Sequence, residues 1–233
     1  MNSVVLRADG VAKRFGARAV LTSASLFARR GCITVLFGRN GSGKTTLLRI
    51  SAGVIGADQG VVHFAGRTWT RPALHQLARA GLFFLPERDL LLRNRSVHEQ
   101  LELIARRFGA ESRVRAVEEE MSLMDYAERY PHELSAGERR RAEMALIVLR
   151  APTCLLADEP LMGSSPNDAD ATAARLRALA DSGCAVVVTG HEVPALLALA
   201  DDIVWVTAGT TCVLGTGIQA RDHWQFRREY LGA

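Results

Sequence analysis

One glycine-rich segment constrains the fold of this chain more than any other feature. The segment Gly38-Arg39-Asn40-Gly41-Ser42-Gly43-Lys44-Thr45, hereafter the phosphate loop, stands between an apolar run and a helix-like run. It matches the pattern GxxxxGK[ST], in which glycines let backbone N–H groups turn toward phosphate oxygens and the next helix directs its positive end at the anion. Lys44 is expected at the β- and γ-phosphates of a nucleotide, and the Thr45 hydroxyl on Mg²⁺. The predicted phosphate-binding residues are Gly38, Arg39, Asn40, Gly41, Ser42, Gly43, Lys44, Thr45 and Thr46.

The composition is that of an ordinary globular protein. Of 233 residues, 48% are hydrophobic and 23% are charged, which excludes a disordered, collagenous or small disulfide-bonded chain. Only Lys13 and Lys44 of the 29 Lys and Arg residues are lysines, so a lysine here marks a position that needs a compact point charge. The cysteines are widely spaced in apolar, strand-like stretches, and we expect each to be a small buried hydrophobe in a reduced, cytosolic setting. They are Cys32, Cys154, Cys184 and Cys212.

Short apolar runs alternate with helix-length segments through most of the chain. This alternation predicts an α/β fold with a mainly parallel sheet covered on both faces, and two strands around a turn at Gly16 form its antiparallel N-terminal part. From 87 to 149 the hydrophobic period becomes helical, which indicates an inserted α-helical subdomain. The predicted strands are Val4–Ala8, Leu21–Phe27, Ile33–Phe37, Val61–Phe64, Leu82–Leu85, Cys154–Ala157, Ala185–Val188 and Ile203–Val206. The predicted helices are Thr45–Ala52, Ala169–Leu179, Pro194–Ala200 and much of Val97–Leu149.

A second chemical signal is the apolar strand Cys154–Ala157, which ends in Asp158 and Glu159. A buried strand that delivers an acid beside a phosphate loop supplies the carboxylate that Mg²⁺ requires, and Asp158 is predicted to hold the ion through its water shell. Glu159 is placed to orient an attacking water or to accept its proton. Together with the phosphate loop, these two carboxylates predict hydrolysis of a bound nucleotide.

The segment Leu134-Ser135-Ala136-Gly137-Glu138, hereafter the signature segment, is similar to the LSGGQ signature of ATP-binding cassette (ABC) ATPases. Nearly the whole chain resembles the ATP-binding subunit of an ABC transporter. Ser135-x-x-Glu138 is also a capping box, which begins a helix whose N–H groups can face a phosphate. The run Arg139-Arg140-Arg141 and the tail Tyr230-Leu231-Gly232 look most like the ATPases of lipopolysaccharide export and branched-chain amino acid import. We interpret the arginine run itself as a solvated helix face.

The resemblance implies roles for single residues. Phe15 matches the aromatic that stacks on adenine, although a core aromatic is the alternative, and His191 matches a histidine at the γ-phosphate. In the family each ATP lies between two subunits. Ser135, Gly137 and Glu138 would therefore contact the nucleotide that another chain holds. The implied catalytic residues are Glu159, His191 and Lys44, and the implied metal ligands are Thr45, Asp158 and Glu87.

The same resemblance implies an organisation and a set of partners. Residues 1–233 would form one ABC ATPase domain, with a RecA-like core at about 1–86 and 150–233 and the helical subdomain at about 87–149. A second ATP-binding subunit, identical or not, would close on ATP, and transmembrane permease subunits would use that motion. The chain would be cytoplasmic and peripheral on the inner face of the cell membrane, with no nucleic acid partner. The apolar run Leu90-Leu91-Leu92 falls where the family receives its permease, and burial inside the subdomain is the alternative.

Three positions depart from the family pattern. Ala136 replaces the first signature glycine, Glu87 replaces a glutamine, and Ser164-Ser165 stands where Leu-Asp is common. A carboxylate at position 87 could hold Mg²⁺ more tightly, or could turn toward Arg88 or Arg93 because like charges near the site repel; we favour the second. The departures favour a heterodimer or slow hydrolysis.

Other functions agree less well with the sequence. A chromosome-type ABC ATPase needs a long coiled coil between phosphate loop and signature, whereas Lys44 and Ser135 are 91 positions apart. Ribosome-acting members usually carry two cassettes. A phosphate-loop kinase or GTPase has no use for the signature segment, and no guanine-reading NKxD occurs. A non-hydrolytic assembly partner, favoured only by the three departures, stays open.

Overall fold

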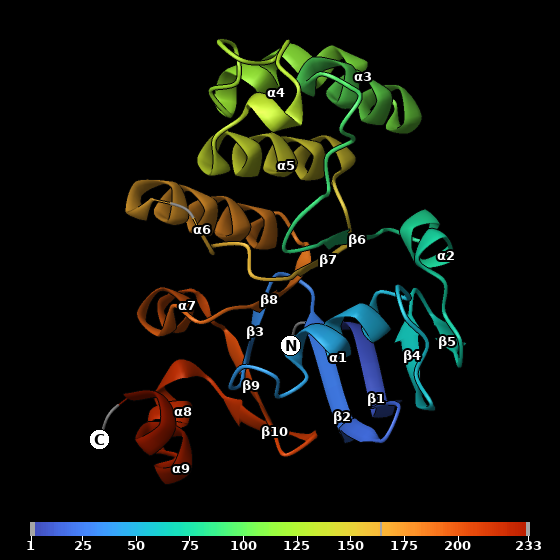
Figure 1. Ribbon diagram of the computed structural model, residues 1–233, viewed down its shortest axis with the longest axis vertical. Helices are drawn as coiled ribbons and strands as arrows, with labels where there is room; N and C mark the ends of the chain where they lie inside the picture. The colour runs from blue at the N-terminus through green and yellow to red at the C-terminus, as the bar shows by residue number, and fades with distance from the viewer. Residues whose placement is uncertain (1–2, 164, 232–233) are drawn as a thin grey trace.

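Strands from before and after the helical segment 86–153 assemble into one ten-stranded mixed sheet (Figure 1). The computed structural model describes residues 3–163 and 165–231, so Ser164 and Gly232 lie outside the described residues. The strands are β1 (Val4–Phe15), β2 (Arg18–Arg29), β3 (Ile33–Phe37), β4 (Gln59–Phe64), β5 (Arg67–Trp69), β6 (Leu82–Leu85), β7 (Cys154–Ala157), β8 (Ala185–Thr189), β9 (Asp202–Thr207) and β10 (Thr210–Gly215). Across the sheet they follow the order β5-β4-β1-β2-β10-β9-β3-β8-β7-β6.

Two kinds of pairing divide this sheet. β5, β4, β1 and β2 pair antiparallel, whereas β9, β3, β8, β7 and β6 pair parallel. The predicted α/β class, with a mainly parallel sheet and an antiparallel N-terminal part, is confirmed. Alternate side chains of the central strands enter different hydrophobic clusters, as Val35 and Leu36 of β3 do. The parallel strands therefore carry apolar residues on both faces, because both faces are covered.

The helices lie on both sides of the sheet and at one end of the molecule. α3, α4 and α5 gather at the top of Figure 1, and α6 packs between α5 and the strands. No helix within residues 3–163 or 165–231 has the length and hydropathy needed to cross a bilayer. The helices are α1 (Lys44–Ser51), α2 (Leu74–Arg79), α3 (Val97–Phe108), α4 (Val114–Glu120), α5 (Ala136–Arg150), α6 (Pro166–Asp181), α7 (Val193–Leu199), α8 (Gly217–Asp222) and α9 (Trp224–Phe226). Shorter turns are η1 (Glu111–Arg113), η2 (Pro131–Glu133) and the π-helical η3 (Arg227–Leu231).

The strongest apolar runs predict the bounds of their strands correctly, whereas elements with a weak hydrophobic pattern are not predicted. β6 and β7 coincide with the predicted strands residue for residue. β5, α2, β10 and the C-terminal helices were not predicted, because each is short or polar. The expected burial is confirmed for Cys32, Cys154 and Cys184 but is wrong for Cys212, which is exposed on the polar strand β10.

The C-terminal helices pack an aromatic cluster behind the strand that leads into the phosphate loop. The ring of Phe226 lies 5.3 Å from Phe37 in β3, 4.9 Å from Tyr230 and 6.2 Å from Trp205, measured between ring centroids. Phe226 is fully buried. Such close edge-to-face and stacked contacts add to the free energy of burying the rings. The end of the described chain thus supports β3 from the side.

We expect Phe226→Ala to lower the free energy of unfolding by about 3–5 kcal/mol, because it leaves a cavity among three other rings. Denaturant titration followed by fluorescence measures this loss. Trp224→Ala is the matched control, since Trp224 lies in the same helix and is 64% exposed. Its cost should stay near 0.5 kcal/mol, as a rough limit for surface changes. Equal costs for the two variants would show that the cluster does not stabilise the fold.

Candidate active site

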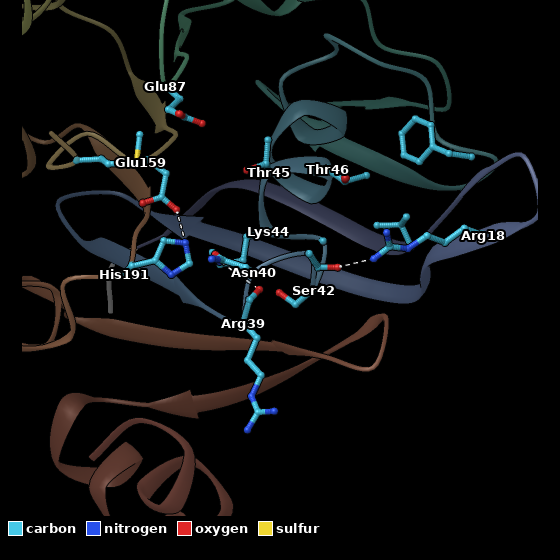
Figure 2. A pocket seen from close by; sticks show the side chains of 15 residues that line it. Arg18, Arg39, Asn40, Ser42, Lys44, Thr45, Thr46, Glu87, Glu159 and His191 are labelled. Atoms are coloured by element: carbon cyan, nitrogen blue, oxygen red, sulfur yellow. Dashed lines mark hydrogen bonds and ion pairs between the residues drawn. The ribbon is translucent and has the colours of Figure 1, made fainter. Parts of the chain in front are cut away.

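The phosphate loop connects β3 to α1 at the carboxyl ends of the buried strands (Figure 2). Gly41 and Gly43 have φ angles of 75° and 107°, in the left-handed region that favours glycine. At Gly38, a Cβ atom would lie 2.7 Å from the carbonyl oxygen of Val206. The path of the loop therefore requires glycine at these positions.

Lys44 is held inside the curve of this loop. Its side chain is buried, and Nζ donates a hydrogen bond of 2.7 Å to the carbonyl oxygen of Gly38. Burial lowers the pKa of Lys44, while the carboxylates of Glu159 and Asp158 act in the opposite direction. The ammonium group is thus held against backbone carbonyl oxygens of the loop and also lines the cavity.

Asp158, the first residue after β7, is joined by one hydroxyl group to the phosphate loop and by another to β8. Its Oδ1 accepts hydrogen bonds from Thr45 Oγ1 at 3.0 Å and from Thr189 Oγ1 at 2.8 Å. Its Oδ2 is buried and has no hydrogen-bond partner among residues 3–163 and 165–231. A buried, unpartnered carboxylate oxygen beside a threonine hydroxyl fits a hard cation such as Mg²⁺, which usually takes its other ligands from phosphates and water.

Glu159 follows Asp158 and contacts His191, the predicted γ-phosphate histidine. Its backbone φ is 49°, a left-handed value that a non-glycine residue seldom adopts, and its N–H donates to Thr189 Oγ1 at 2.9 Å. His191 Nε2 lies 3.1 Å from Glu159 Oε1 (Figure 2). Burial raises the pKa of Glu159 to about 7, while burial and nearby Lys44 lower the pKa of His191. A neutral imidazole therefore faces a carboxyl group that titrates near neutral pH.

Most of the phosphate loop, with Glu159 and His191, lines a cavity of about 490 Å³, whereas the predicted site residues Gly38 and Asp158 lie behind its lining. Phe15 stands at one end and is 51% exposed, so the alternative of a core aromatic is wrong. Arg18, Val20 and Met162 also line the cavity and were not predicted from the sequence, because no local motif marks them. The predicted residues that line it are Phe15, Arg39, Asn40, Gly41, Ser42, Gly43, Lys44, Thr45, Thr46, Glu87, Glu159 and His191.

Arg39 contributes to the rim, but its side chain points away from the other labelled residues of the cavity (Figure 2). Its Nε lies 3.1 Å from Oε1 of Glu229 in η3. A phosphate contact by this guanidinium would require breaking that pair. The backbone carbonyl oxygen of Arg39 accepts a hydrogen bond from the N–H of Ser42 at 3.0 Å, inside the loop.

The signature segment lies elsewhere on the same chain. Ser135 caps α5 by accepting the N–H of Glu138 at 3.3 Å, and Glu138 Oε2 accepts the N–H of Ser135 at 2.8 Å, which completes the predicted capping box. In the described part of this chain, none of Ser135, Gly137 and Glu138 lines the phosphate-loop cavity. A single chain does not bring signature and phosphate loop together.

The interpretation of the arginine run as a solvated face holds for Arg139, which is exposed, but is wrong for Arg140, which is buried. Arg139 donates to the carbonyl oxygen of Pro131 at 2.9 Å, and Arg141 Nε donates to Tyr126 Oη at 2.9 Å. Arg140 is buried, lies 2.8 Å from the buried Glu143, and donates to the backbone carbonyl of Glu87 at 3.3 Å. Burial raises the pKa of Glu143 to about 7. Three successive arginines reach three different segments because the helix turns each side chain about 100° from the last.

Glu87 borders both the cavity and this arginine. Its Oε1 lies 3.2 Å from Arg88 Nε, which agrees with the expectation that the carboxylate turns toward a neighbouring arginine. It also lines the cavity, so its position alone does not exclude a metal ligand. In the following run, Leu91 is buried whereas Leu92 is 54% exposed. Burial therefore holds for Leu91 and not for Leu92, and contact of this run with a permease stays a prediction.

Comparison with known proteins agrees with this geometry. Residues 21–162 match the ABC transporter family. The chain is 33% identical to a probable ABC transporter ATP-binding protein of Azorhizobium caulinodans, over 97% of this chain and 83% of that protein. It is 31% identical to the lipopolysaccharide export system ATP-binding protein LptB of Escherichia coli, over 97% of both. A solved ATP-binding cassette in its ADP conformation superposes with a TM-score of 0.84 at 22% identity, covering 99% of this chain and 100% of that one. A dimeric cassette in a post-hydrolysis state with ADP and Pi gives 0.79 at 20% identity, covering 88% and 96%.

The chain therefore belongs to the ABC transporter family. It is an ATP-binding subunit of this family, an ATPase whose hydrolysis of ATP powers transport. The resemblance inferred from the signature segment is confirmed at the level of family and fold. The roles of single residues stay predictions.

We expect the hydrolysis rate at saturating ATP to rise with pH between about 6 and 8, because Glu159 accepts a proton only as a carboxylate. Burial raises the pKa of Glu159 to about 7, so well below that value the rate should fall about tenfold for each pH unit. A steady-state ATPase profile measures this. The affinity for a fluorescent ATP analogue over the same range separates proton loss from binding. A constant rate from about pH 5 to 8 would contradict the shifted pKa of this base.

We expect Glu87→Gln to leave basal hydrolysis within about threefold of the wild-type rate, a change below about 1 kcal/mol in the barrier. The reason is that the carboxylate of Glu87 pairs with Arg88. Its backbone carbonyl accepts a hydrogen bond from Arg140, and the substitution retains this backbone contact. In this hypothesis Glu87 couples the helical segment to the site and contributes little to the chemistry. ATPase assays across Mg²⁺ concentrations decide the matter. A tenfold loss of rate, or a large shift in the Mg²⁺ requirement, would identify the carboxylate as a working ligand.

Proposed function

We propose that the phosphate-loop cavity binds ATP together with Mg²⁺ for hydrolysis. One observation carries this proposal: Asp158 accepts a hydrogen bond from Thr45 of the phosphate loop and keeps a buried oxygen without a protein partner. The buried hydroxyl oxygen of Ser42 in the loop also lacks a partner in the described part of the chain. Ser42 lines the phosphate-loop cavity, and a cation held beside Asp158 and Thr45 would neutralise charge on the β- and γ-phosphates.

The charged and hydroxyl-bearing residues of the site receive roles from their chemistry. Lys44 would contact the β- and γ-phosphates, and Thr45 and Asp158 would hold Mg²⁺. Glu159 would accept the proton of the attacking water, since its raised pKa suits a general base near neutral pH. His191, 3.1 Å from that carboxylate, would orient it and contact the γ-phosphate.

The adenine would stack on Phe15, whose exposed ring borders the cavity. Lys13 is the other lysine of the chain. Its Nζ lies 5.6 Å from the centroid of the Phe15 ring and 3.0 Å from Asp58 Oδ1. A cation on the ring face opposite the adenine would hold the Phe15 ring in one orientation for stacking. This arrangement supports the predicted role of Phe15.

A second ATP-binding subunit, the same chain or a related one, would complete the site. The signature segment lies outside the cavity of its own chain and presents a capped helix N-terminus. Such an end favours an anion, so it would contact the γ-phosphate bound to the partner subunit. A structurally similar cassette forms a dimer with ADP and Pi. In this chain the changes at Ala136 and Ser165 favour pairing with a different subunit or slow turnover.

The transport function assigns the remaining partners. Permease subunits would span the membrane and receive the motion of residues 87–149, which we propose as a helical subdomain inserted into a RecA-like core at 1–86 and 150–233. The exposed Leu92 beside Glu87 supports contact with such a subunit. The chain would then be cytoplasmic and peripheral on the inner face of the cell membrane, without a nucleic acid partner. LptB-like relatives are named for lipopolysaccharide export, and an exported lipid is one substrate class to test.

We expect Glu159→Gln to retain ATP binding, to lower turnover by about 10²–10⁴, and to trap a two-chain species with ATP, because the amide keeps the shape but cannot accept a proton. Size-exclusion chromatography with and without ATP, combined with ATPase assays, measures both effects. Lys44→Ala is the matched control: it removes a charge-assisted phosphate contact and should cost one to two decades in affinity, or roughly 1.5–3 kcal/mol. A Glu159→Gln chain that hydrolyses ATP at the wild-type rate, or a Lys44→Ala chain that binds normally, would contradict the assignment.

A further inference from the structure

Two helices, α5 and α6, begin next to one another and share one carboxylate, that of Asp168. Asp168 lies in the first turn of α6, where its Oδ2 accepts a hydrogen bond from the N-cap residue Ser165 at 2.7 Å. Its Oδ1 lies 2.8 Å from Arg141 Nη1 in α5. Arg141 is in turn held by Tyr126 through a 2.9 Å hydrogen bond. Asp168 therefore ties the helix that begins with the signature segment to the helix that follows Glu159.

This carboxylate also occupies the space beside Gly137 of the signature segment. A Cβ atom at Gly137 would lie 2.8 Å from Asp168 Cγ and closer still to its Oδ2. Real Cβ contacts of this length do not occur, so any larger residue at 137 would displace Asp168. Gly137 itself has an ordinary helical backbone and does not appear among the residues with positive φ. The reason for glycine here is a close neighbour within the same chain, not the backbone conformation.

The departures from the family pattern agree with this contact. Ala136, where the sequence lacks a glycine, is exposed and accommodates its methyl group. Gly137, one residue later, has no room for one. At the start of α6 the expected aspartate is replaced by Ser165, and the carboxylate is found three residues later at Asp168. Asp168 lies in the first turn of α6 and beside the first turn of α5, where a carboxylate interacts favourably with both helix dipoles.

We propose that Asp168 is a positioning residue for the signature segment, and that Gly137 is retained in order to admit its carboxylate. The ion pair with Arg141 is partly shielded, since the side chains of Arg141 and Asp168 are 30% and 24% exposed. The contact fixes the direction in which Ser135 and the first N–H groups of α5 point. The inference rests on the proposed function, because a fixed signature matters only if it contacts a nucleotide.

The first test compares Asp168→Ala with Asp170→Ala in the full chain. Asp170 lies in the same turn of α6 and is exposed, so it is the matched control. We expect Asp168→Ala to lower kcat at least about fivefold, because the signature is no longer held. The affinity of the phosphate loop for a fluorescent ATP analogue and the melting temperature should stay near the wild-type values, which a general loss of structure would not allow. Asp170→Ala should behave as wild type in all three measurements.

The second test is a double-mutant cycle with Gly137→Ala. Alone, Gly137→Ala should lower kcat at least about tenfold, because its methyl group displaces the carboxylate. Asp168→Ala removes the three atoms that this methyl would meet, so Gly137→Ala combined with Asp168→Ala should be no slower than Asp168→Ala alone. Multiplicative losses in the double variant would mean that the methyl crowds the nucleotide instead, and would overturn the proposal. So would wild-type turnover in Asp168→Ala. A wild-type chain that neither binds nor hydrolyses ATP would refute the proposed function itself, which is a different result.

Discussion

The site depends on the parallel pairing of three buried strands, β3, β8 and β7. Leu36 of β3 pairs with Thr189 of β8, and Ala157 of β7 pairs with Val188. This register places Thr189 beside Asp158, the residue that follows β7, and both lie next to the phosphate loop that follows β3. A slip of one residue would turn every side chain to the other face of the sheet and separate these groups. The burial of apolar residues on both faces fixes the register, and the chemistry follows from it.

Charge is concentrated where solvent is scarce. Lys44, Asp158 and Glu159 are all buried, and taking such groups out of water costs several kcal/mol for each ion unless partners compensate, by rough estimates. Burial is the main reason that the pKa of Lys44 is lowered and the pKa of Glu159 is raised. Both shifts favour the neutral form of the side chain. In the proposed function, a phosphate would pair with Lys44 and a cation with the carboxylates. The fold therefore holds buried charged groups whose proposed partners come from a ligand.

The parts of the site that one local motif encodes could be predicted, and the parts that packing creates could not. The phosphate loop and Asp158-Glu159 each follow a strand in sequence, so pattern alone located them. Thr189 contacts Asp158 only because β8 pairs with β7, and a strand order is not written in local spacing. The arginine run shows the same limit: charge and spacing suggested a solvated face, whereas Arg140 is buried because other segments fold over it.

The uneven burial of the cysteines has a practical consequence. Cys32, Cys154 and Cys184 are buried, and burial raises the pKa values of Cys154 and Cys184, so their reactive thiolate forms are disfavoured. Cys212 is exposed on β10, and β10 pairs with β9, the neighbour of β3. A thiol-reactive dye should therefore attach at one position of the unaltered chain. A dye on Cys212 of the wild-type protein would lie close in the sheet to β3, the strand that leads into the phosphate loop.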